Sequence, residues 1–439
     1  MFLQGNAPLN KFSLRCKTRY DSARVDSWIA NVLDRGVKDL DVYISSNGDY
    51  PLPSEILMSK TLVRLKIGGG NEEFTIYDIK DVFLPNLKFL YLLDDIVFDE
   101  TGDKVSKLLS GCPVLEELVM INLMWGLSEF CSVSSSTLKR VTICSEIIDE
   151  NPRNVSFDTP NLVYLEFSDV VAIKYPKVNF DSLVEARLGL QLTPIQEKRS
   201  RASRDGYSSN DDEEEEMDAN AADFLTGISN VKILYLSSDT LEVLNLCCKA
   251  IPVFNNLIHL TIETHQDVGW DSLPNLLGNC PNLETIVFKG LDYKDTNRCE
   301  DETYRFNNDT YKCWDENGKR CVCKPWKGTP IGLSSSPVKT LKVFEFGEIC
   351  SYNDDMDKQS EVIKYFLETM PNLEQVTLYW DTSFDDDLSI QLTEFQMLEK
   401  VASPKCKIQI ISDNISYSTT VHSSPSSNGL VFFSNRFPV

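Results

Sequence analysis

Apolar residues recur along the chain in a six-residue frame, in which a leucine or valine is followed, three and five places later, by two further apolar residues. In one copy Leu87, Leu90 and Leu92 fill these places. The alternation of Leu90, Tyr91 and Leu92 is typical of a half-buried strand, and Pro85 lies ahead of it, where it interrupts no ladder of strand hydrogen bonds. Because a single frame is common by chance, the prediction depends on its recurrence.

Further frames begin at Leu9, Val37, Leu62, Leu115, Leu138, Leu162, Val231, Leu257, Leu283, Leu341 and Leu373, with a weaker one at Leu183. Successive starts from Leu9 to Leu162 differ by 28, 25, 25, 28, 23 and 24 residues. These intervals match the roughly 20–29 residues of a leucine-rich repeat, in which one strand and one return element form each unit. A single unit cannot bury its own apolar face, so neighbouring units must stack. The pattern therefore predicts an α/β leucine-rich-repeat solenoid, horseshoe-like, with parallel strands on its concave face and helices or irregular returns on its convex face.

The segments between the frames predict the return elements. Residues 25–34 place apolar side chains at helical spacing, and Gly36 follows as a helix stop. Residues 104–109 indicate a second helix. Three helical segments are followed by a cysteine or methionine and then a proline, at Cys112-Pro113, Cys280-Pro281 and Met370-Pro371. We expect the sulfur-bearing residue to fill the turn and the proline to prevent the helix from continuing.

Gaps in the spacing divide the chain into five predicted segments. Residues 1–192 hold N-terminal repeats, and 193–223 form an insertion that we expect to be disordered because seven acids lie in 211–218. The remaining segments are 224–330, further repeats with a cysteine-bearing loop at 292–329, then 331–411, C-terminal repeats and a cap, and 412–439, a flexible serine-rich tail. The first frame begins close to residue 1 without the polar cap that solenoids need. We therefore expect another module to precede it or the product to be truncated.

Composition limits the partners and the compartment. Lys and Arg total 43 against 66 Asp and Glu, which gives a net charge of −23. This charge argues against binding to nucleic acid or anionic membranes and permits basic partners. Thirteen cysteines, several among apolar residues, suit a reducing compartment, and neither a secretory signal nor a run of about 18 apolar residues is visible. We therefore expect a cytoplasmic or nuclear protein with no membrane span.

Three groups of short motifs are spread along the chain from residue 28 to residue 374. They are Trp28-Ile29 with residues 37–42, 52–56 and 60–65; residues 224–228 with 234–237; and Lys324-Pro325-Trp326 with residues 336–343, 361–367 and 370–374. In these motifs the sequence resembles plant F-box proteins that carry leucine-rich repeats and a C-terminal FBD region. On this resemblance, residues 331–411 are FBD-like.

The resemblance implies a non-catalytic protein-interaction module, the substrate-recognition part of an SCF-type (Skp–cullin–F-box) ubiquitin ligase. In such proteins an N-terminal F-box binds a Skp-type adaptor and the repeats hold the target protein. This sequence departs from the family because no segment has the pattern of an F-box. The Skp-type adaptor and cullin are therefore expected partners only if an F-box precedes Met1. The repeats also lack the regular asparagine or cysteine that closes the longer repeat consensus, so we expect a less uniform stack.

The candidate binding residues are the two variable side chains beside the central apolar residue of each frame, because these positions point to the concave face. Exposed aromatics near arginine are enriched in binding hot spots. The selected residues are Arg64, Lys66, Phe89, Tyr91, Arg140, Tyr164, Glu166 and Tyr235, and the wider set adds Glu117, Val119, Thr142, His259, Thr261, Thr285, Val287, Gln375 and Thr377. We predict a protein-binding surface; the alternative is that these side chains pack on a loop or a neighbouring strand.

Metal binding has one weak set of candidates: Cys299, Cys313, Cys321 and Cys323. Their spacings of 13, 7 and 1 intervening residues lack the paired C-x2-C knuckles of structural zinc sites, so an irregular loop with free thiols is the favoured interpretation. We expect no metal and no other cofactor.

Catalysis has little support in the sequence. The histidines His259, His265 and His422 have no catalytic signature beside them, and no phosphate-binding motif follows the glycines at 68–70. We therefore expect no enzyme. Two alternatives to the ligase subunit stay open: an F-box-less stand-alone or competing target binder, and a small-molecule receptor with a basic concave pocket.

Overall fold

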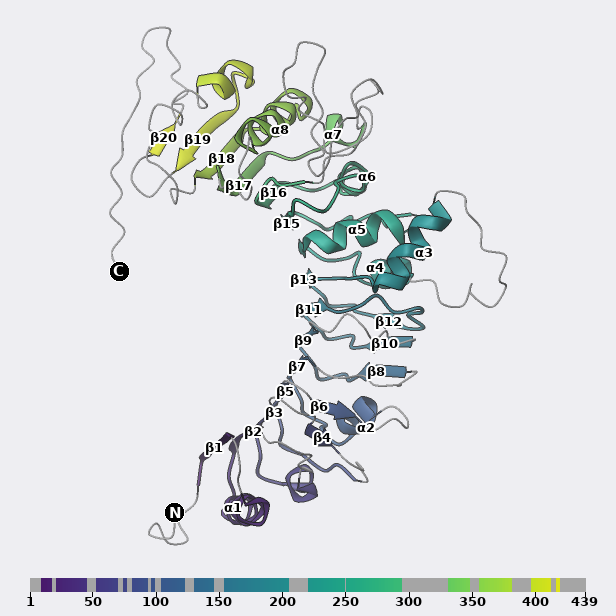
Figure 1. Cartoon of the computed structure of the whole chain (residues 1–439), viewed down its shortest axis with the longest axis vertical. Helices are drawn as coiled ribbons and strands as arrows, with labels where there is room; N and C mark the ends of the chain where they lie inside the picture. Colours follow the sequence, from purple (N-terminus) through teal and green to yellow (C-terminus); the bar gives the residue numbers. More distant parts are fainter. Residues whose placement is uncertain are drawn as a thin grey trace, which may run out of the picture. The chain divides into compact units, whose positions relative to one another are not determined.

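The computed structural model describes residues 9–17, 21–45, 53–69, 74–76, 81–93, 96–98, 104–122, 130–145, 154–204, 220–248, 250–293, 331–347, 355–380, 396–411 and 416–418 (Figure 1). The chain forms two compact units. Unit 1 comprises Met1–Val231 with Leu246–Ala250, and unit 2 comprises Lys232–Asn245 with Ile251–Val439. Each unit is built on parallel strands from successive repeats.

The main sheet of unit 1 takes one strand from each predicted repeat. In spatial order its parallel strands are β1 (Lys11–Lys17), β2 (Asp39–Ser45), β3 (Arg64–Gly69), β5 (Phe89–Leu93), β7 (Glu117–Ile121), β9 (Arg140–Cys144), β11 (Tyr164–Ser168) and β13 (Glu185–Leu188). The central residue of each frame pairs with that of the next frame, so that Leu65 lies between Leu40 and Leu90. All three leucines are fully buried. The predicted leucine-rich-repeat solenoid is confirmed.

Return elements cover one side of this sheet in unit 1 (Figure 1). The helical ones are α1 (Ser22–Asp34), η1 (Ser54–Met58), α2 (Lys104–Ser110), α3 (Pro194–Arg204) and α4 (Ala222–Gly227). The predicted helices α1 and α2 are confirmed. Helix α1 buries Val25, Ile29 and Val32, and Gly36 follows it with a φ of 72°, a left-handed conformation that favours glycine.

Other returns in unit 1 are strands, where we expected helices or irregular segments. β8 (Phe130–Ser134), β10 (Asn154–Asp158) and β12 (Val178–Asn179) form a second sheet, and β4 (Phe74–Ile76) pairs with β6 (Ile96–Phe98). Every second residue of β8 and β10 is apolar and buried, which is the strand period rather than the helical one. The rings of Phe157, Phe167 and Phe224 meet in the layer behind the main sheet, with centroids 5.2 to 5.9 Å apart.

Residues 194–204, which we expected to belong to a disordered insertion, form helix α3. A reciprocal capping box starts this helix, because the Thr193 backbone N–H donates to the Gln196 side chain and the Gln196 N–H donates to the Thr193 hydroxyl. The Gln196 amide also donates to the backbone oxygen of Val171, which anchors the helix to the preceding repeat. Residues 205–219, which carry the acidic run, lie outside the described residues, and the other segment boundaries stay predictions.

Unit 2 continues the same architecture. Its strands, in spatial order, are β14 (Ile233–Leu236), β15 (His259–Glu263), β16 (Thr285–Lys289), β17 (Thr340–Phe346), β18 (Gln375–Trp380), β19 (Lys407–Ile411) and the antiparallel β20 (Ser416–Ser418). Its helices are α5 (Ser238–Leu246), which ends in unit 1, α6 (Leu273–Gly278), α7 (Ile331–Ser334) and α8 (Asp355–Thr369). No helix within the described ranges of either unit has the length and apolarity of a membrane span.

The frame that we predicted to start at Leu341 starts earlier in the chain, at Val338. In the structure Leu341 is the central residue of the frame and pairs with Ile286, so the frame starts at the buried Val338. Phe344, expected to point inward, is 38% exposed. Phe344 points outward because it follows the inward-facing Val343 in the strand alternation and pairs in regular register with Lys289. A bulge comes after it, where Glu345 adopts a positive φ of 58°, and this bulge returns Phe346 to the buried side.

The predicted turn after each helix is confirmed. Cys112, Cys280 and Met370 are at most 2% exposed, and each cysteine thiol donates to a backbone oxygen of the helix before it. A related feature was not predicted. In the Pro-Asn-Leu sequences at these and similar turns, the asparagine amide donates to a backbone oxygen of the preceding repeat, as Asn86, Asn161, Asn282 and Asn372 do to Lys60, Ser136, Asn255 and Ser336.

Candidate binding face

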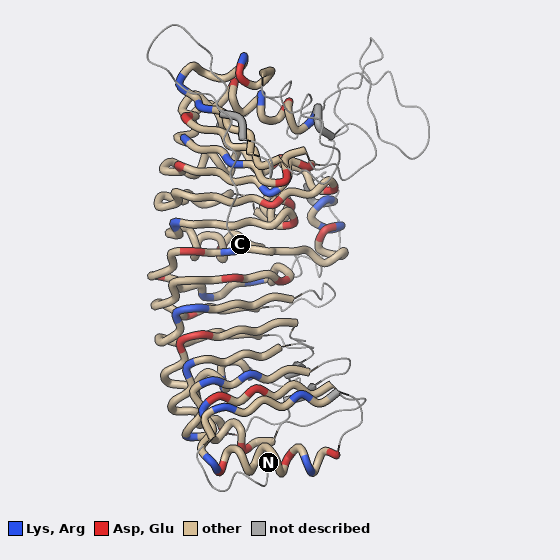
Figure 2. Tube along the Cα trace, turned by 90° about the vertical axis from the view of Figure 1, so that its left-hand side faces the viewer, with Lys and Arg blue, Asp and Glu red and all other residues tan. Residues whose placement is uncertain are grey.

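Alternate side chains of the unit 1 sheet point away from the buried layer and form what we call the open face. Strand pairing aligns them in two rows. The first is Lys11, Asp39, Arg64, Phe89, Glu117, Arg140, Tyr164 and Glu185, and the second is Ser13, Asp41, Lys66, Tyr91, Val119, Thr142, Glu166 and Arg187. Neighbours in a row are about 4.8 Å apart, the spacing of adjacent strands. Figure 2 looks onto these strands and shows both signs of charge on them.

Seven of the eight predicted binding residues lie in these two rows. On β3 and β5 the structure brings three of them together. The Arg64 guanidinium lies 4.9 Å from the ring centre of Phe89 and 5.2 Å from that of Tyr91, so one arginine contacts two aromatic rings. The Tyr91 hydroxyl donates to Glu117 at 2.8 Å. Partial burial and this bond to a carboxylate raise the pKa of Tyr91, so the phenol stays protonated and the ring stays fixed.

A second cluster forms on β9, β11 and β13. Its centre is Tyr164, whose ring lies 3.9 Å from the Arg140 guanidinium and 5.8 Å from that of Arg187. The Tyr164 hydroxyl donates to Glu166 at 2.9 Å. Burial, the bond to Glu166 and the charge of that carboxylate raise the pKa of Tyr164 to about 12. The Tyr164 ring thus contacts two arginines, and its hydroxyl is fixed by the hydrogen bond to Glu166.

Two members of this cluster escaped the sequence prediction. Arg187 contacts the Tyr164 ring and pairs with Glu185 at 2.9 Å, and both residues lie on β13. Their frame starts at Leu183 and has Ala186 at its centre, so it counted as weak and its flanking side chains were left out. The strand register predicts both positions, because β13 pairs with β11 and places Glu185 beside Tyr164 and Arg187 beside Glu166. Glu117 belonged to the wider set of face positions but not to the selected residues.

The eighth predicted residue, Tyr235, lies in unit 2 on β14. Its hydroxyl donates to Glu263, and the Lys289 ammonium lies 4.9 Å from its ring centre. A further aromatic pair on this sheet was not predicted: Phe344 and Tyr379 stack with centroids 4.3 Å apart and planes 2° apart. The two residues lie side by side because each follows directly after the paired residues Val343 and Leu378.

The candidate residues for metal binding and catalysis do not belong to the open face of unit 1. Cys299, Cys313, Cys321 and Cys323 lie outside the described residues, and so does His422. In unit 2 the His259 ring lies 3.4 Å from the Thr261 hydroxyl, and His265 lies 3.6 Å from the Asp267 carboxylate. Within the described parts of the chain, no group of three or more His, Cys, Asp or Glu is placed to hold a metal ion.

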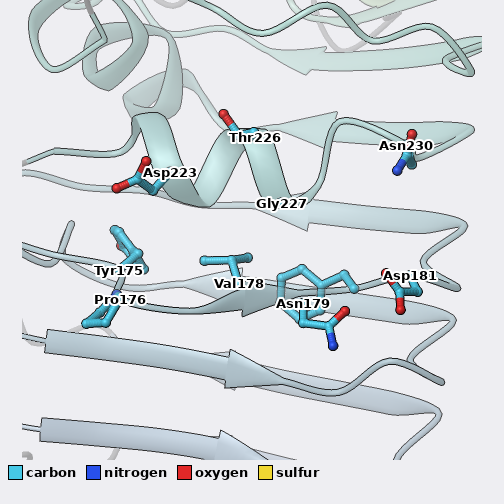
Figure 3. Close-up of a pocket in the computed structure, with 10 residues that line it drawn as sticks. Tyr175, Pro176, Val178, Asn179, Asp181, Asp223, Thr226, Gly227 and Asn230 are labelled. Atoms are coloured by element: carbon cyan, nitrogen blue, oxygen red, sulfur yellow. The ribbon is translucent and has the colours of Figure 1, made fainter.

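Unit 1 also has a hollow on the side of the return elements, between the β12 segment and α4 (Figure 3). Its volume is about 530 Å³. The lining residues are Tyr175, Pro176, Val178, Asn179, Phe180, Asp181, Asp223, Thr226, Gly227 and Asn230. They include two acids and neither lysine nor arginine, so this hollow does not provide the basic pocket that the small-molecule alternative requires.

Comparison with known proteins identifies close relatives. The family model for the leucine-rich repeats of the FBD-associated F-box protein At5g56370 matches residues 25–179. The F-box/LRR-repeat protein At3g59200 of Arabidopsis thaliana is 53% identical over 423 residues, which cover 96% of this chain and 76% of that protein. The F-box/LRR-repeat protein At3g59210 of the same plant is 51% identical over 419 residues, covering 95% of this chain and 81% of that protein.

Proposed function

Because the chain belongs to the plant F-box/leucine-rich-repeat family, we propose that its open face binds a target protein for an SCF-type ubiquitin ligase. The observation that carries the proposal is the pair of arginine–aromatic clusters around Tyr91 and Tyr164. Tyrosine and arginine dominate the energetics of protein interfaces, because they bury large surfaces and still form hydrogen bonds. Both rings are held in place within the free chain, so binding costs little side-chain entropy.

The proposed role is recognition and not catalysis. The repeats present the target, while transfer of ubiquitin belongs to the other subunits of the ligase. The adaptor contact of such a ligase is made through an F-box, a part that the names of the relatives include. We therefore expect a Skp-type adaptor and a cullin as partners wherever an F-box is joined to these repeats.

The face is tested with the paired variant Tyr91→Ala/Tyr164→Ala, expressed as the full tagged chain in plant cells. Proteins captured by the wild-type chain should be lost from the variant. A control is Phe130→Ala, a change at an exposed aromatic on β8, which belongs to the second sheet and not to the open face. If the paired variant keeps the captured proteins at wild-type levels, the open face is not the binding site.

The ligase role has a separate test. Skp-type adaptor and cullin should co-purify with the repeats when they are joined to the F-box of a relative, and a bound target should then gain ubiquitin. Capture of targets by the joined protein without adaptor and cullin would contradict the ligase role. That result would favour the alternative, a stand-alone or competing repeat protein that uses the same face without ubiquitin transfer.

A further inference from the structure

On the open face the carboxylates have hydrogen-bond or ion-pair partners, whereas two of the arginines have no carboxylate partner among the described residues. Its five carboxylates all have partners: Asp39 pairs with Lys11, Asp41 accepts the Ser13 hydroxyl, Glu117 and Glu166 accept tyrosine hydroxyls, and Glu185 pairs with Arg187. Arg64 and Arg140 contact aromatic rings and have no carboxylate partner among the described residues. Elsewhere in unit 1, Arg24 and Arg201 are paired with Asp21 and Glu197. The face therefore offers unpaired cations, although the whole chain carries a net charge of −23.

The ring contacts prepare these two arginines to bind an anion. A guanidinium held against aromatic rings without a carboxylate partner can still offer its N–H donors, in a planar fork that matches a carboxylate or a phosphate. Because the rings hold the guanidinium in place, less side-chain freedom is lost on binding. Lys66, next to Arg64 on the same strand, also has no acidic partner among the described residues and adds positive charge to this end of the face.

The register fixes the separation of the two arginines. Arg64 on β3 and Arg140 on β9 occupy the same row and are three strand steps apart, through β5 and β7. Three steps of about 4.8 Å place them about 14 Å apart. An extended peptide advances about 3.4 Å per residue and therefore spans this distance in about four residues. In that row Phe89 and Glu117 lie between the arginines, with the Glu117 carboxylate bonded to the Tyr91 hydroxyl. Beside them on the same two strands, Tyr91 and Val119 offer apolar surface.

We infer that the open face binds an extended acidic segment of the target, laid across β3 to β9. Acidic side chains at positions i and i+4 of that segment bind Arg64 and Arg140, and an apolar side chain at i+2 packs between them on Tyr91 and Val119. This inference rests on the proposed function and adds to it the chemistry of the target. Aspartate, glutamate and phosphoserine all supply the required anion.

The experiment is a selection of twelve-residue peptides from a random displayed library on the immobilised full chain. Selected peptides should be enriched in two acids four residues apart, and their binding should weaken as salt is raised. Titration of a labelled selected peptide should show about tenfold weaker binding to Arg64→Gln and to Arg140→Gln, the loss of one charge-assisted contact each. Arg24→Gln, on α1 and away from the face, is the matched control and should bind as the wild type does.

Two substituted versions of the selected peptide identify the anion that the arginines bind. Replacing both acids by glutamine should abolish binding, and replacing them by phosphoserine tells whether the arginines prefer phosphate to carboxylate. Thermal unfolding of each variant confirms that it is folded. Arg64→Lys and Arg140→Lys keep the charge without the fork and should bind with intermediate affinity.

The outcomes separate the inference from the proposed function. If the selected peptides lose binding to Tyr91→Ala/Tyr164→Ala but contain no paired acids and tolerate both arginine changes, the face binds a target of different chemistry and the inference is overturned. If no selected peptide depends on the open face at all, both the inference and the proposed function fail.

Discussion

The Arg140 guanidinium lies 3.9 Å from the centre of the Tyr164 ring, and the two residues come from neighbouring strands of the unit 1 sheet. A cation–π contact of this kind stabilises an exposed pair by about 0.5–1 kcal/mol. Its larger effect is on geometry, because the ring is bound by Arg140 on its face and by Glu166 at its hydroxyl. The clusters on the open face are thus formed before any partner arrives.

Tyr164 gives a prediction for alkaline pH. Its pKa in the folded chain is about 12, above the ordinary value of 10, so the folded state favours the protonated phenol. The stability from this group is therefore fully present below pH 10 and is lost as the pH rises from 10 through 12. Ultraviolet difference spectra of the wild type against Tyr164→Phe should show one phenol that ionises near pH 12. A difference that titrates near pH 10 would contradict the bond to Glu166.

Glu116 gives the opposite prediction for acid. It accepts bonds from Lys88 and Lys139 on the two neighbouring repeats, each at 2.8 Å, and these bonds lower its pKa from 4.5 to about 2. A lowered pKa means that the stability is present above pH 4.5 and is lost as the pH falls through 2. Glu116→Gln should lower the unfolding temperature at pH 7, and the difference from the wild type should shrink toward pH 2. A constant difference across that range would exclude the ion pairs as its cause.

The asparagine bonds between repeats can be tested within one tripeptide sequence. Asn282 in Pro281-Asn282-Leu283 donates to the backbone oxygen of Asn255 at 2.8 Å. Asn282→Ala should reduce the free energy of unfolding by about 1 kcal/mol, the ordinary value of one hydrogen bond. Chemical denaturation measures this change.

The matched control for Asn282 lies a few residues away in the chain. Pro274-Asn275-Leu276 has the same sequence but lies in helix α6, where Asn275 is exposed. Asn275→Ala should leave stability unchanged or raise it slightly, because alanine is the better helix former. Equal losses from the two changes would mean that the bond between repeats contributes nothing.

The fold could be predicted because the leucine frame contains two patterns: alternate apolar residues, which indicate a strand, and a regular recurrence along the chain, which indicates a repeat. Register follows from both, and it places Arg64, Phe89 and Tyr91 side by side. The frame fails where it is ambiguous: Val338 and Leu341 both start an apolar pattern of the right form, and only the pairing of Leu341 with Ile286 on the neighbouring strand decides between them. Contacts such as that of Arg187 with Tyr164 depend on side-chain geometry across strands, which no local pattern contains.

The close contact between Gly227 and Val178 gives the last prediction. A methyl group added to Gly227 on α4 would lie 2.1 Å from the Val178 side chain on β12, far inside the contact distance of two carbon atoms. Gly227→Ala should therefore destabilise unit 1 by about 1–3 kcal/mol, the usual cost of overpacking. The double change Gly227→Ala/Val178→Ala removes the nearest obstructing carbon, Cγ1 of Val178, but leaves Cβ 2.7 Å from the added methyl, so it should recover only part of that loss. The control is Gly269→Ala, where the nearest atom is 3.8 Å from the added methyl and little change is expected. Equal destabilisation by the two glycine changes would show that helix propensity or backbone freedom, and not the packing of α4 on β12, determines the effect.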